Sequence, residues 1–204
     1  TTRHYWEQKR SPQIPPTPDL ALDIEVIGEL PPPAPPSDAS VAAGLRRVTN
    51  YIRSRSIEQT RPGEGDQPAF VSREPNVFPK PIPPGDHALA AFDASYSMAP
   101  YVLGPDDALV ITGRWPECRV ANVSLWNRHL QTYDYVHRSV SFNRAQTKLE
   151  PDGSFRIVIA HRDPGVANWL DTEGRPFGMV FWRYFLPEGE IATPQAKMVK
   201  LSDL

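Results

Sequence analysis

The chain has 204 residues, an apolar share of 40% and a net charge of −2. A chain of this length buries roughly 70% of its unfolded surface when it folds, so it needs no disulfide or metal to stabilise a core. The slightly negative charge disfavours non-specific binding to nucleic acid, which requires a basic surface. No run reaches the ~18 apolar residues of a membrane span, so we expect neither a nucleic-acid partner nor a span.

Cys118 is the only cysteine, so no disulfide can form within the chain. A lone cysteine fits a reducing compartment. Residues 1–10 are polar and lack the apolar centre of a secretory signal peptide. We therefore predict a cytoplasmic protein. Thr1 is not a natural initiator, so we expect a processed product, an expression fragment or part of a longer protein.

Proline is the compositional outlier, with 24 residues of 204, about twice the usual ~5%. Most prolines precede Asp106, and proline both fixes φ and removes a hydrogen-bond donor, so this half cannot be mostly regular structure. We predict three regions. Residues 1–36 form a Pro-rich arm with one strand, residues 37–92 a helix followed by a Pro/Gly-rich wrapping segment, and residues 93–204 a β-rich domain.

The arm carries Tyr5 and Trp6, and aromatic side chains in an arm typically anchor it on its own domain or on another subunit. Residues 20–27 alternate between apolar and acidic side chains from Leu22 on, which predicts a half-exposed strand. Residues 30–36 are a polyproline linker. We expect oligomers, either of one chain or with another, to form through this arm.

A helix is predicted to begin after a cap at Ser37 or Asp38 and to run to about Gln59. Its apolar residues recur at intervals of four, three and four positions, which places them on one face. These residues are Val41, Leu45, Val48 and Ile52. The segment 63–84 that follows combines prolines and glycines with apolar residues, which indicates that it wraps the domain.

Strand patterns dominate from Asp93 onward, over 108–115, 119–135, 155–160, 179–185 and 196–201. Several closely spaced strands separated by turn residues are typical of a sandwich or barrel. We predict a mainly β fold, with an antiparallel β-sandwich or jelly-roll-like body, one peripheral α-helix and a Pro-rich wrapping arm.

Two predicted strands each carry an apolar face that leads into polar residues. The apolar phase of 121–125 continues to Asn127, His129 and Gln131, and the phase of 155–159 continues to His161. Buried polar groups must be satisfied, so these positions either pair with one another or line a cavity. The predicted cleft is lined by Asn127, His129, Tyr133 and His161. In the alternative interpretation, each histidine only bonds a backbone carbonyl at the end of its strand.

The candidates for acid–base catalysis are His129, His161 and Asp163. Together with His137 and Asp134, these three residues could supply enough ligands for a metal ion. The sequence contains no closely spaced metal-binding motif, however. We therefore predict no metal and no cofactor. Cys118 has no visible base nearby in the sequence, so a structural thiol is favoured over a nucleophile.

An aromatic and basic cluster follows the second strand region. Such a cluster binds an anionic or planar ligand through arginine contacts and ring stacking, or forms a subunit interface, where tyrosine and arginine are enriched. The sequence is compatible with both the ligand site and the subunit interface. The cluster consists of Tyr133, Tyr135, His137, Arg138, Asn143 and Arg144.

The turn at 161–165 contains Asp-Pro-Gly, where glycine takes the positive φ. Asn168 is expected to hold the following loop through its backbone, and Trp169 to be a buried plug against the core. Both are also candidate ligand-binding residues, together with Arg183. That arginine either stacks on its aromatic neighbours or pairs with Asp163 or Asp171.

The string Asp152-Gly153-Ser154-Phe155, then Pro164-Gly165, Asn168-Trp169-Leu170 and Arg183 resembles the signature of domain-of-unknown-function family 1214. The resemblance covers roughly 104–201. It implies a mostly β domain and the C-terminal half of a longer, actinobacterial-type member. It brings no catalytic residue, cofactor or substrate.

Three functions follow from these features. The first is a ligand-binding or accessory module whose Trp/Tyr/His/Arg surface holds a small molecule or a protein partner. The second is an enzyme acting on a small lipid- or steroid-like metabolite, with His129 or His161 as the acid–base group. The third is an assembly subunit whose arm embraces a neighbour.

Overall fold

The computed structural model describes residues 23–25, 28, 31–58, 68–85 and 91–204. The chain divides into two compact units, one comprising 1–14 and 62–204 and the other 15–61. The described part of the first unit is a β-rich body, and that of the second carries a helix.

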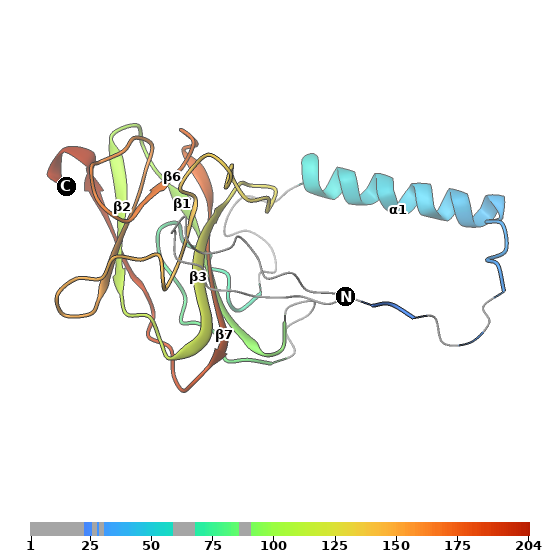
Figure 1. The fold of residues 1–204 in the computed structure, drawn as a ribbon. Coiled ribbons are helices and arrows are strands. Elements are labelled where there is room, and N and C mark those ends of the chain that lie inside the picture. Colours follow the sequence, from blue (N-terminus) through green and yellow to red (C-terminus); the bar gives the residue numbers. More distant parts are fainter. Residues whose placement is uncertain (1–22, 26–27, 29–30, 59–67, 86–90) are drawn as a thin grey trace. The chain divides into compact units, whose positions relative to one another are not determined.

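The body consists of two four-stranded sheets (Figure 1). The first sheet has the order β1 (Ala94–Val102), β7 (Phe177–Pro187), β3 (Cys118–Trp126) and β4 (Ser141–Asn143). The second sheet has the order β6 (Trp169–Asp171), β5 (Phe155–Ala160), β2 (Asp107–Gly113) and β8 (Gln195–Lys200). Only β5 and β6 pair in parallel among the described strands. A 3-10 turn, Leu201–Asp203, follows β8. The predicted mainly β, sandwich-like fold with one α-helix is confirmed.

Alternation along the strands builds the main core. The expected inward phases of β3 and β5 are confirmed, because alternate residues of 121–125 and 155–159 belong to that core. Trp182 on β7 is fully buried, with its ring 5.4 Å from that of Phe155 and 5.5 Å from that of Trp115. Large aromatic side chains of this kind supply much of the apolar area that a core buries.

The segment 68–85 covers the free edge of β1. Val71 forms an isolated bridge with Met98, and Ile82 forms one with Tyr96. Phe78 from the same segment is buried and meets Trp182 edge-on, with ring centroids 6.1 Å apart. An uncovered sheet edge invites pairing with other chains, so this segment both blocks that edge and contributes to the core.

The second unit contains α1 (Asp38–Ser56), which begins at the expected cap. The Ser37 hydroxyl accepts a hydrogen bond from the Ser40 backbone N–H at 3.2 Å. The helix ends three residues before the predicted Gln59. The strand expected over 20–27 is wrong for 23–25, which form no strand, and its other residues lie outside those described, as do Tyr5 and Trp6. Within the described residues no helix is both long and apolar enough to cross a membrane.

Substituting Gly178→Ala should destabilise the body by roughly 2–3 kcal/mol, because the site has no room for a methyl group. A Cβ at this β7 position would lie 2.6 Å from Cε1 of Tyr101 and 2.7 Å from the backbone oxygen of Trp126, and would also meet the Tyr133 hydroxyl. Chemical denaturation measures the change. Gly44→Ala on α1, where nothing lies within 4 Å, is the control and should leave the unfolding of the body unchanged.

Asp107 should stabilise the body at neutral pH and lose that effect in acid. Its carboxylate accepts hydrogen bonds from Lys200 Nζ at 2.6 Å and from the Gly104 N–H at 3.0 Å, and these lower the pKa of Asp107 below its ordinary value. A lowered pKa in the folded state means that the stabilisation is complete above the unfolded pKa of about 4 and is lost as the pH falls through the folded value.

Asp107→Asn should therefore lower the Tm at pH 7, and the difference from the wild type should shrink below about pH 4. Thermal unfolding followed by circular dichroism from pH 2 to 8 tests this. Glu188→Gln is the control, because the exposed Glu188 carboxylate has no ion pair among the described residues. A pH-independent Tm difference would contradict the assignment.

Candidate functional site

The polar end of β3 forms a tight turn rather than the wall of a cleft. The strand ends at Trp126, and Asn127 then accepts hydrogen bonds on Oδ1 from the backbone N–H groups of His129 at 2.8 Å and Gln131 at 3.1 Å. The expected continuation of the strand phase to Gln131 is therefore wrong. The side-chain amide of Asn127 competes for the backbone and reverses the chain there.

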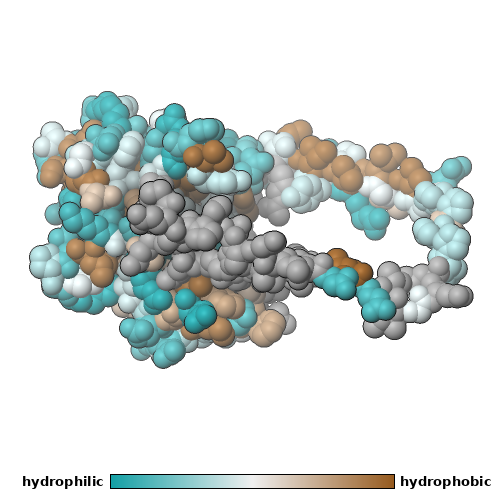
Figure 2. All heavy atoms as spheres, viewed as in Figure 1, coloured by the Kyte–Doolittle hydropathy of each residue, from teal (hydrophilic) through white to brown (hydrophobic). Residues whose placement is uncertain are grey.

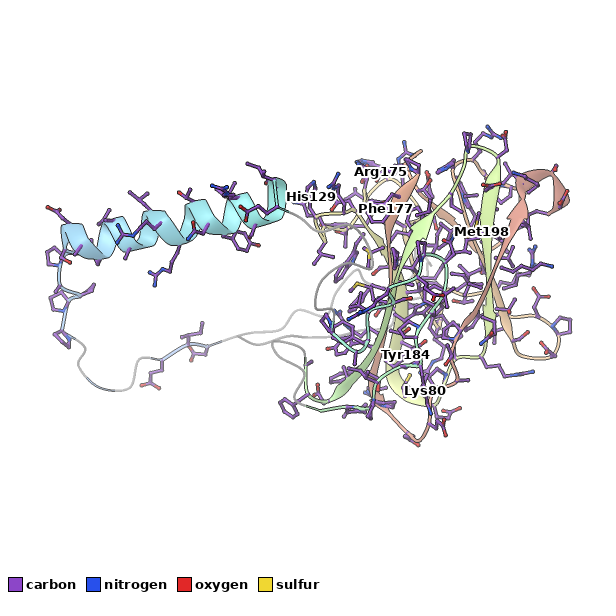
Figure 3. The ribbon with its side chains drawn as sticks, turned by 180° about the vertical axis from the view of Figure 1, so that it is seen from behind. Lys80, His129, Arg175, Phe177, Tyr184 and Met198 are labelled. Carbon is purple, nitrogen blue, oxygen red and sulfur yellow. The ribbon has the colours of Figure 1, made fainter. Side chains whose placement is uncertain are left out.

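His129 lies on this turn with an exposed side chain. Figure 3 shows it at the same end of the body as Arg175 and Phe177, whereas Tyr184 and Lys80 lie toward the other end. His129 therefore does not continue the inward face of β3.

The segment 171–175 begins at the last residue of β6, leads toward β7 and is called the loop 171–175 below; it carries three charged side chains with partners in the body. Asp171 is buried, and its Oδ2 accepts a hydrogen bond from Arg138 at 2.6 Å. Glu173 accepts one from the Asp134 N–H at 2.6 Å and another from Arg175 Nε at 3.2 Å. The contacts with Arg138 and with the Asp134 N–H join the loop to the chain that follows β3, and the pairing with Asp171 raises the pKa of Arg138.

Tyr133 attaches to the same loop. Its hydroxyl lies 2.7 Å from that of Tyr101, and the Arg175 guanidinium carbon lies 5.3 Å from the centre of the Tyr133 ring. Burial raises the pKa of both tyrosines, so both stay protonated at neutral pH. The tyrosine pair is a buried structural contact rather than the lining of an open pocket.

His161 follows β5 and also reaches this loop. Its Nδ1 lies 2.5 Å from Thr172 Oγ1, and its Nε2 lies 3.4 Å from the backbone oxygen of Leu103. Both ring nitrogens therefore have partners in the protein. The structure brings Tyr133 and His161 to one loop, but it places Asn127 and His129 on a separate turn.

Asp163 serves the turn after β5, where its Oδ1 accepts a hydrogen bond from the Gly165 N–H at 2.8 Å. The carboxylate is exposed, and Gly165 has a φ of 74°. This is the turn geometry that the Asp-Pro-Gly sequence predicts. In the described residues, no group of three or more histidine, cysteine, aspartate or glutamate side chains is placed to hold a metal ion.

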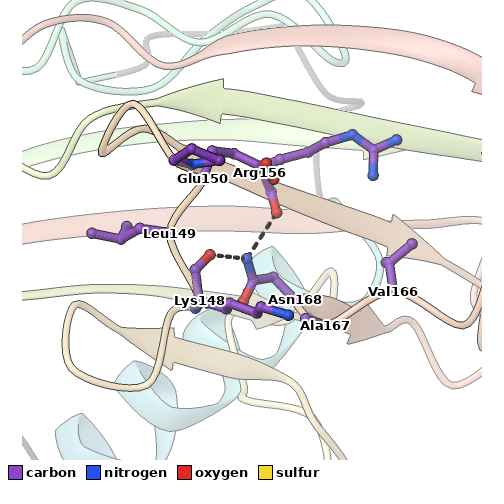
Figure 4. Close-up of a pocket in the computed structure, with 8 residues that line it drawn as sticks. Lys148, Leu149, Glu150, Arg156, Val166, Ala167 and Asn168 are labelled. Atoms are coloured by element: carbon purple, nitrogen blue, oxygen red, sulfur yellow. Dashed lines mark hydrogen bonds between the residues drawn. The ribbon is translucent and has the colours of Figure 1, made fainter.

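Asn168 is a buried link between three stretches of backbone, as expected from its sequence context. Its Oδ1 accepts a hydrogen bond from the Lys148 N–H at 2.9 Å, and its Nδ2 donates to the carbonyls of Lys148 at 2.8 Å and Arg156 at 3.0 Å (Figure 4). A surface pocket of about 360 Å³ lies beside it. The pocket is lined by Lys148, Leu149, Glu150, Pro151, Arg156, Val166, Ala167 and Asn168.

Trp169 and Arg183 lie on the outer faces of the two sheets. Trp169 is half-buried and packs with Val158 and Ala160 outside the second sheet, while its Nε1 donates to the Ala160 carbonyl at 3.1 Å. The expectation that Trp169 plugs the main core is therefore wrong, and the fully buried Leu170 lies in that core instead. Arg183 lies with its guanidinium carbon 5.1 Å from the centre of the Phe181 ring and 5.9 Å from that of Tyr96. It therefore contacts aromatic rings, although not those of its sequence neighbours Trp182 and Tyr184, on which stacking was expected.

The aromatic and basic cluster does not form one surface. His137 Nδ1 lies 2.9 Å from an Asp134 oxygen and lowers the pKa of that carboxyl. Arg144 donates to the Cys118 carbonyl at 3.1 Å, on a different part of the chain, and Tyr135 is exposed. Sequence reasoning missed the loop 171–175, although its run of acidic and basic residues in a turn between two strands was a usable signal.

The second candidate surface belongs to α1. Its apolar residues are exposed, with relative accessibilities from 46% to 64%, and Figure 2 shows apolar side chains gathered along one side of the helix. We call these four residues the α1 stripe: Val41, Leu45, Val48 and Ile52. An exposed apolar row on an amphipathic helix marks a surface that another element covers.

No protein-family model and no curated protein matches the chain. Among solved structures, an uncharacterised protein from Burkholderia cenocepacia is 27% identical with a TM-score of 0.66, over 85% of this chain and 47% of that protein. The VPA0106 protein from Vibrio parahaemolyticus is 21% identical with a TM-score of 0.44, over 53% of this chain and 31% of that protein. The chain thus spans about half the length of the Burkholderia protein, at 47%.

Asn168→Ala should destabilise the body by roughly 1–3 kcal/mol, because it removes a buried amide and leaves three partly buried backbone groups, at Lys148 and Arg156, without that partner. The change should appear in the denaturation midpoint. Gln131→Ala is the matched control, since it removes an exposed amide from a turn and should cost less than about 1 kcal/mol. Equal effects of the two substitutions would contradict the linking role of Asn168.

Proposed function

We propose that the protein is a non-catalytic accessory module of the β-sandwich type that self-associates through the α1 stripe. The observation that carries this proposal is the row of four exposed apolar side chains on α1. The exposed stripe restricts the assembly hypothesis to α1. The arm that was expected to mediate assembly lies largely outside the described part of the chain.

The spacing of the stripe favours pairing between helices. Intervals of four, three and four residues are those of the a and d positions of a coiled coil, which form a narrow seam. Membrane-surface helices instead carry a wide apolar face with large aromatic anchors. A second α1 is therefore a better partner for this stripe than a lipid surface.

The residues beside the seam permit a second copy to approach. The positions that flank it are small, polar or aromatic, namely Ala42, Gly44, Thr49 and Tyr51. Arg46, Arg47 and Arg53 fall at outer positions of the repeat, so they would not face each other across a dimer. Arg53 is already paired with Glu58 on its own chain. Arg55 falls at the next seam position after Ile52, in the last turn of α1, so like-charge repulsion between two parallel copies is confined to that end of the seam.

The free energy that burial of the α1 stripe contributes to dimerisation is modest. Burying the exposed parts of four such side chains contributes roughly 3–7 kcal/mol for each helix. Fewer than two heptads make a short seam, so we expect a reversible dimer with a micromolar dissociation constant rather than an obligate one. Isolated helices of this length are marginally stable in water, so pairing would also stabilise α1 itself.

The enzyme alternative has less support. It requires His129 or His161 to act on a lipid- or steroid-like metabolite. His161 has both ring nitrogens engaged, and His129 lies on an exposed turn and lines neither of the two pockets described for the body. General acid–base catalysis needs a group within hydrogen-bond reach of a bound substrate. The geometry therefore favours an accessory role.

Membership of domain-of-unknown-function family 1214 is part of the same proposal. It is supported by the motif residues from Asp152 to Arg183. The uncharacterised Burkholderia protein shares the fold but carries no family name. The unmatched 15% of this chain is shorter than the unit 15–61, so part of the helix-bearing unit is matched as well. A role for α1 shared by both proteins is consistent with that match.

Sedimentation velocity from 1 to 200 µM tests self-association. The wild type should shift from monomer to dimer, and Leu45→Asp, which puts a charge in the seam, should raise the dissociation constant at least tenfold. Asn50→Asp adds the same charge to an exposed position outside the stripe and should leave association unchanged.

Three results would overturn the proposal. A wild type that stays monomeric throughout would exclude the dimer. Equal association of Leu45→Asp and Asn50→Asp would place the interface elsewhere. Co-sedimentation of the wild type, but not of Leu45→Asp, with anionic lipid vesicles would assign the stripe to a membrane surface instead.

A further inference from the structure

The second sheet has an apolar outer face, on the side away from the main core. Ala108, Val158 and Ala160 are buried there. Around them lie partly buried apolar side chains, which are Val110, Val166, Trp169, Val199, Leu201 and Leu204. This face is therefore a second apolar surface, independent of α1.

Two surface pockets open on this face, and they share one residue, Arg156. The first is the pocket of about 360 Å³ beside Asn168. The second, of about 240 Å³, lies over β2 and β8. It is lined by Val110, Thr112, Arg156, Gln195, Ala196, Lys197, Val199, Asp203 and Leu204. We call the two pockets together the groove, because Arg156 lines both of them. The volume of the first pocket lies in the range of roughly 300–1,000 Å³ that is typical of small-molecule sites.

Arg156 reaches the groove because of its strand phase. Its neighbours Phe155 and Ile157 point into the main core, so the residue between them points outward. It stands opposite Thr112 of β2 and is half-buried. Figure 4 shows its side chain extending over the side of the pocket where Val166 lies.

The guanidinium of Arg156 has no hydrogen-bond or ion-pair partner among the residues that the structure describes. Other arginines of the body are paired: Arg114 with Asp152, Arg138 with Asp171 and Arg162 with Asp106. A half-buried arginine that lines two pockets and has no carboxylate partner is suited to an external anion.

The charges around the groove favour a single negative charge on the ligand. Lys148 and Lys197 stand at its rim in addition to Arg156, and neither ammonium group has a partner in the described part of the chain. Glu150 and Asp203 are the acidic residues of the lining. Three cationic side chains against two acidic ones leave one net positive charge.

We infer that this groove binds a monocarboxylate with a hydrocarbon body, such as a medium-chain fatty acid, with Arg156 as the residue that holds the carboxylate. The planar guanidinium forms two parallel hydrogen bonds to a carboxylate, which a lysine ammonium cannot do. The hydrocarbon part lies against Val110, Val199 and Leu204, or against Val166 on the other side of Arg156. This site is independent of the proposed dimer of α1.

Titration of the full chain with octanoate, followed by two-dimensional amide NMR, tests the inference directly. Shifts should concentrate at Val110, Thr112, Arg156 and Val199, and the affinity should fall as salt is raised, since a charge pair carries part of the binding. Octanol, which has the same chain but no charge, should bind at least tenfold more weakly. Octylamine should not bind.

Variants separate the carboxylate contact from general surface effects. Arg156→Gln should weaken octanoate binding by about 10- to 100-fold and leave octanol binding unchanged, whereas Arg156→Lys should recover only part of the loss. Arg119→Gln, on an exposed arginine of the first sheet, is the matched control and should bind octanoate like the wild type.

The inference fails if octanoate produces no saturable shifts on the outer face of the second sheet. It also fails if Arg156→Gln, shown to be folded by its amide spectrum, binds octanoate as the wild type does. If that variant does not fold, Lys197→Gln at the exposed rim replaces it and should weaken octanoate binding two- to fivefold without changing octanol binding. An unchanged octanoate affinity in Lys197→Gln would then overturn the charge argument.

Discussion

Strand β7 must be covered on both of its faces, and the rest of the body is arranged to do so. Its inward residues Val180, Trp182 and Tyr184 belong to the main core between the sheets, while Phe181 is buried on the opposite face. A strand that is apolar on both sides lowers the free energy of the body only when each side has a cover. The second sheet covers one face, and the segment 68–85, with side chains of β1 and β3, covers the other.

The polar residues at the Arg175 end of the body hold this arrangement in place. Asp171, Glu173 and Thr172 connect the loop before β7 to Arg138, to the Asp134 backbone and to His161. Each of these contacts satisfies a group whose burial would otherwise be unfavourable. The polar residues that looked most chemical in the sequence therefore serve mainly to fix loops against the two sheets.

Two surfaces take no part in covering β7 or in fixing the loops. One is the α1 stripe, whose narrow seam suits another helix. The other is the groove around Arg156, where a guanidinium without a partner among the described residues lines two pockets that combine apolar and polar side chains. They differ in chemistry, since the first offers only apolar contact and the second combines apolar contact with a positive charge. An accessory module that both associates and carries a small acidic ligand would use them separately.

The sequence by itself determined the elements whose signals are local. The alternation in 121–125 and 155–159 predicts which side chains enter the core, because side chains of a strand point to opposite faces in turn. The cap at Ser37 and the spacing of the α1 stripe depend only on neighbouring residues along the chain. Asn168 was also predictable as a link for its loop, since a buried asparagine bonds nearby backbone.

Only the tertiary structure decided which distant residues meet. Extending the phase of β3 past Trp126 failed because Asn127 turns the chain, so His129 and His161 could not be placed from strand patterns. Arg138 donates a hydrogen bond to Asp171, and the hydroxyls of Tyr101 and Tyr133 bond each other, although more than 30 positions of sequence separate the partners of each pair. The solitary position of Arg156 likewise depends on which strands lie beside β5. Pairings of this kind follow from sheet order and loop closure, which no local pattern of residues contains.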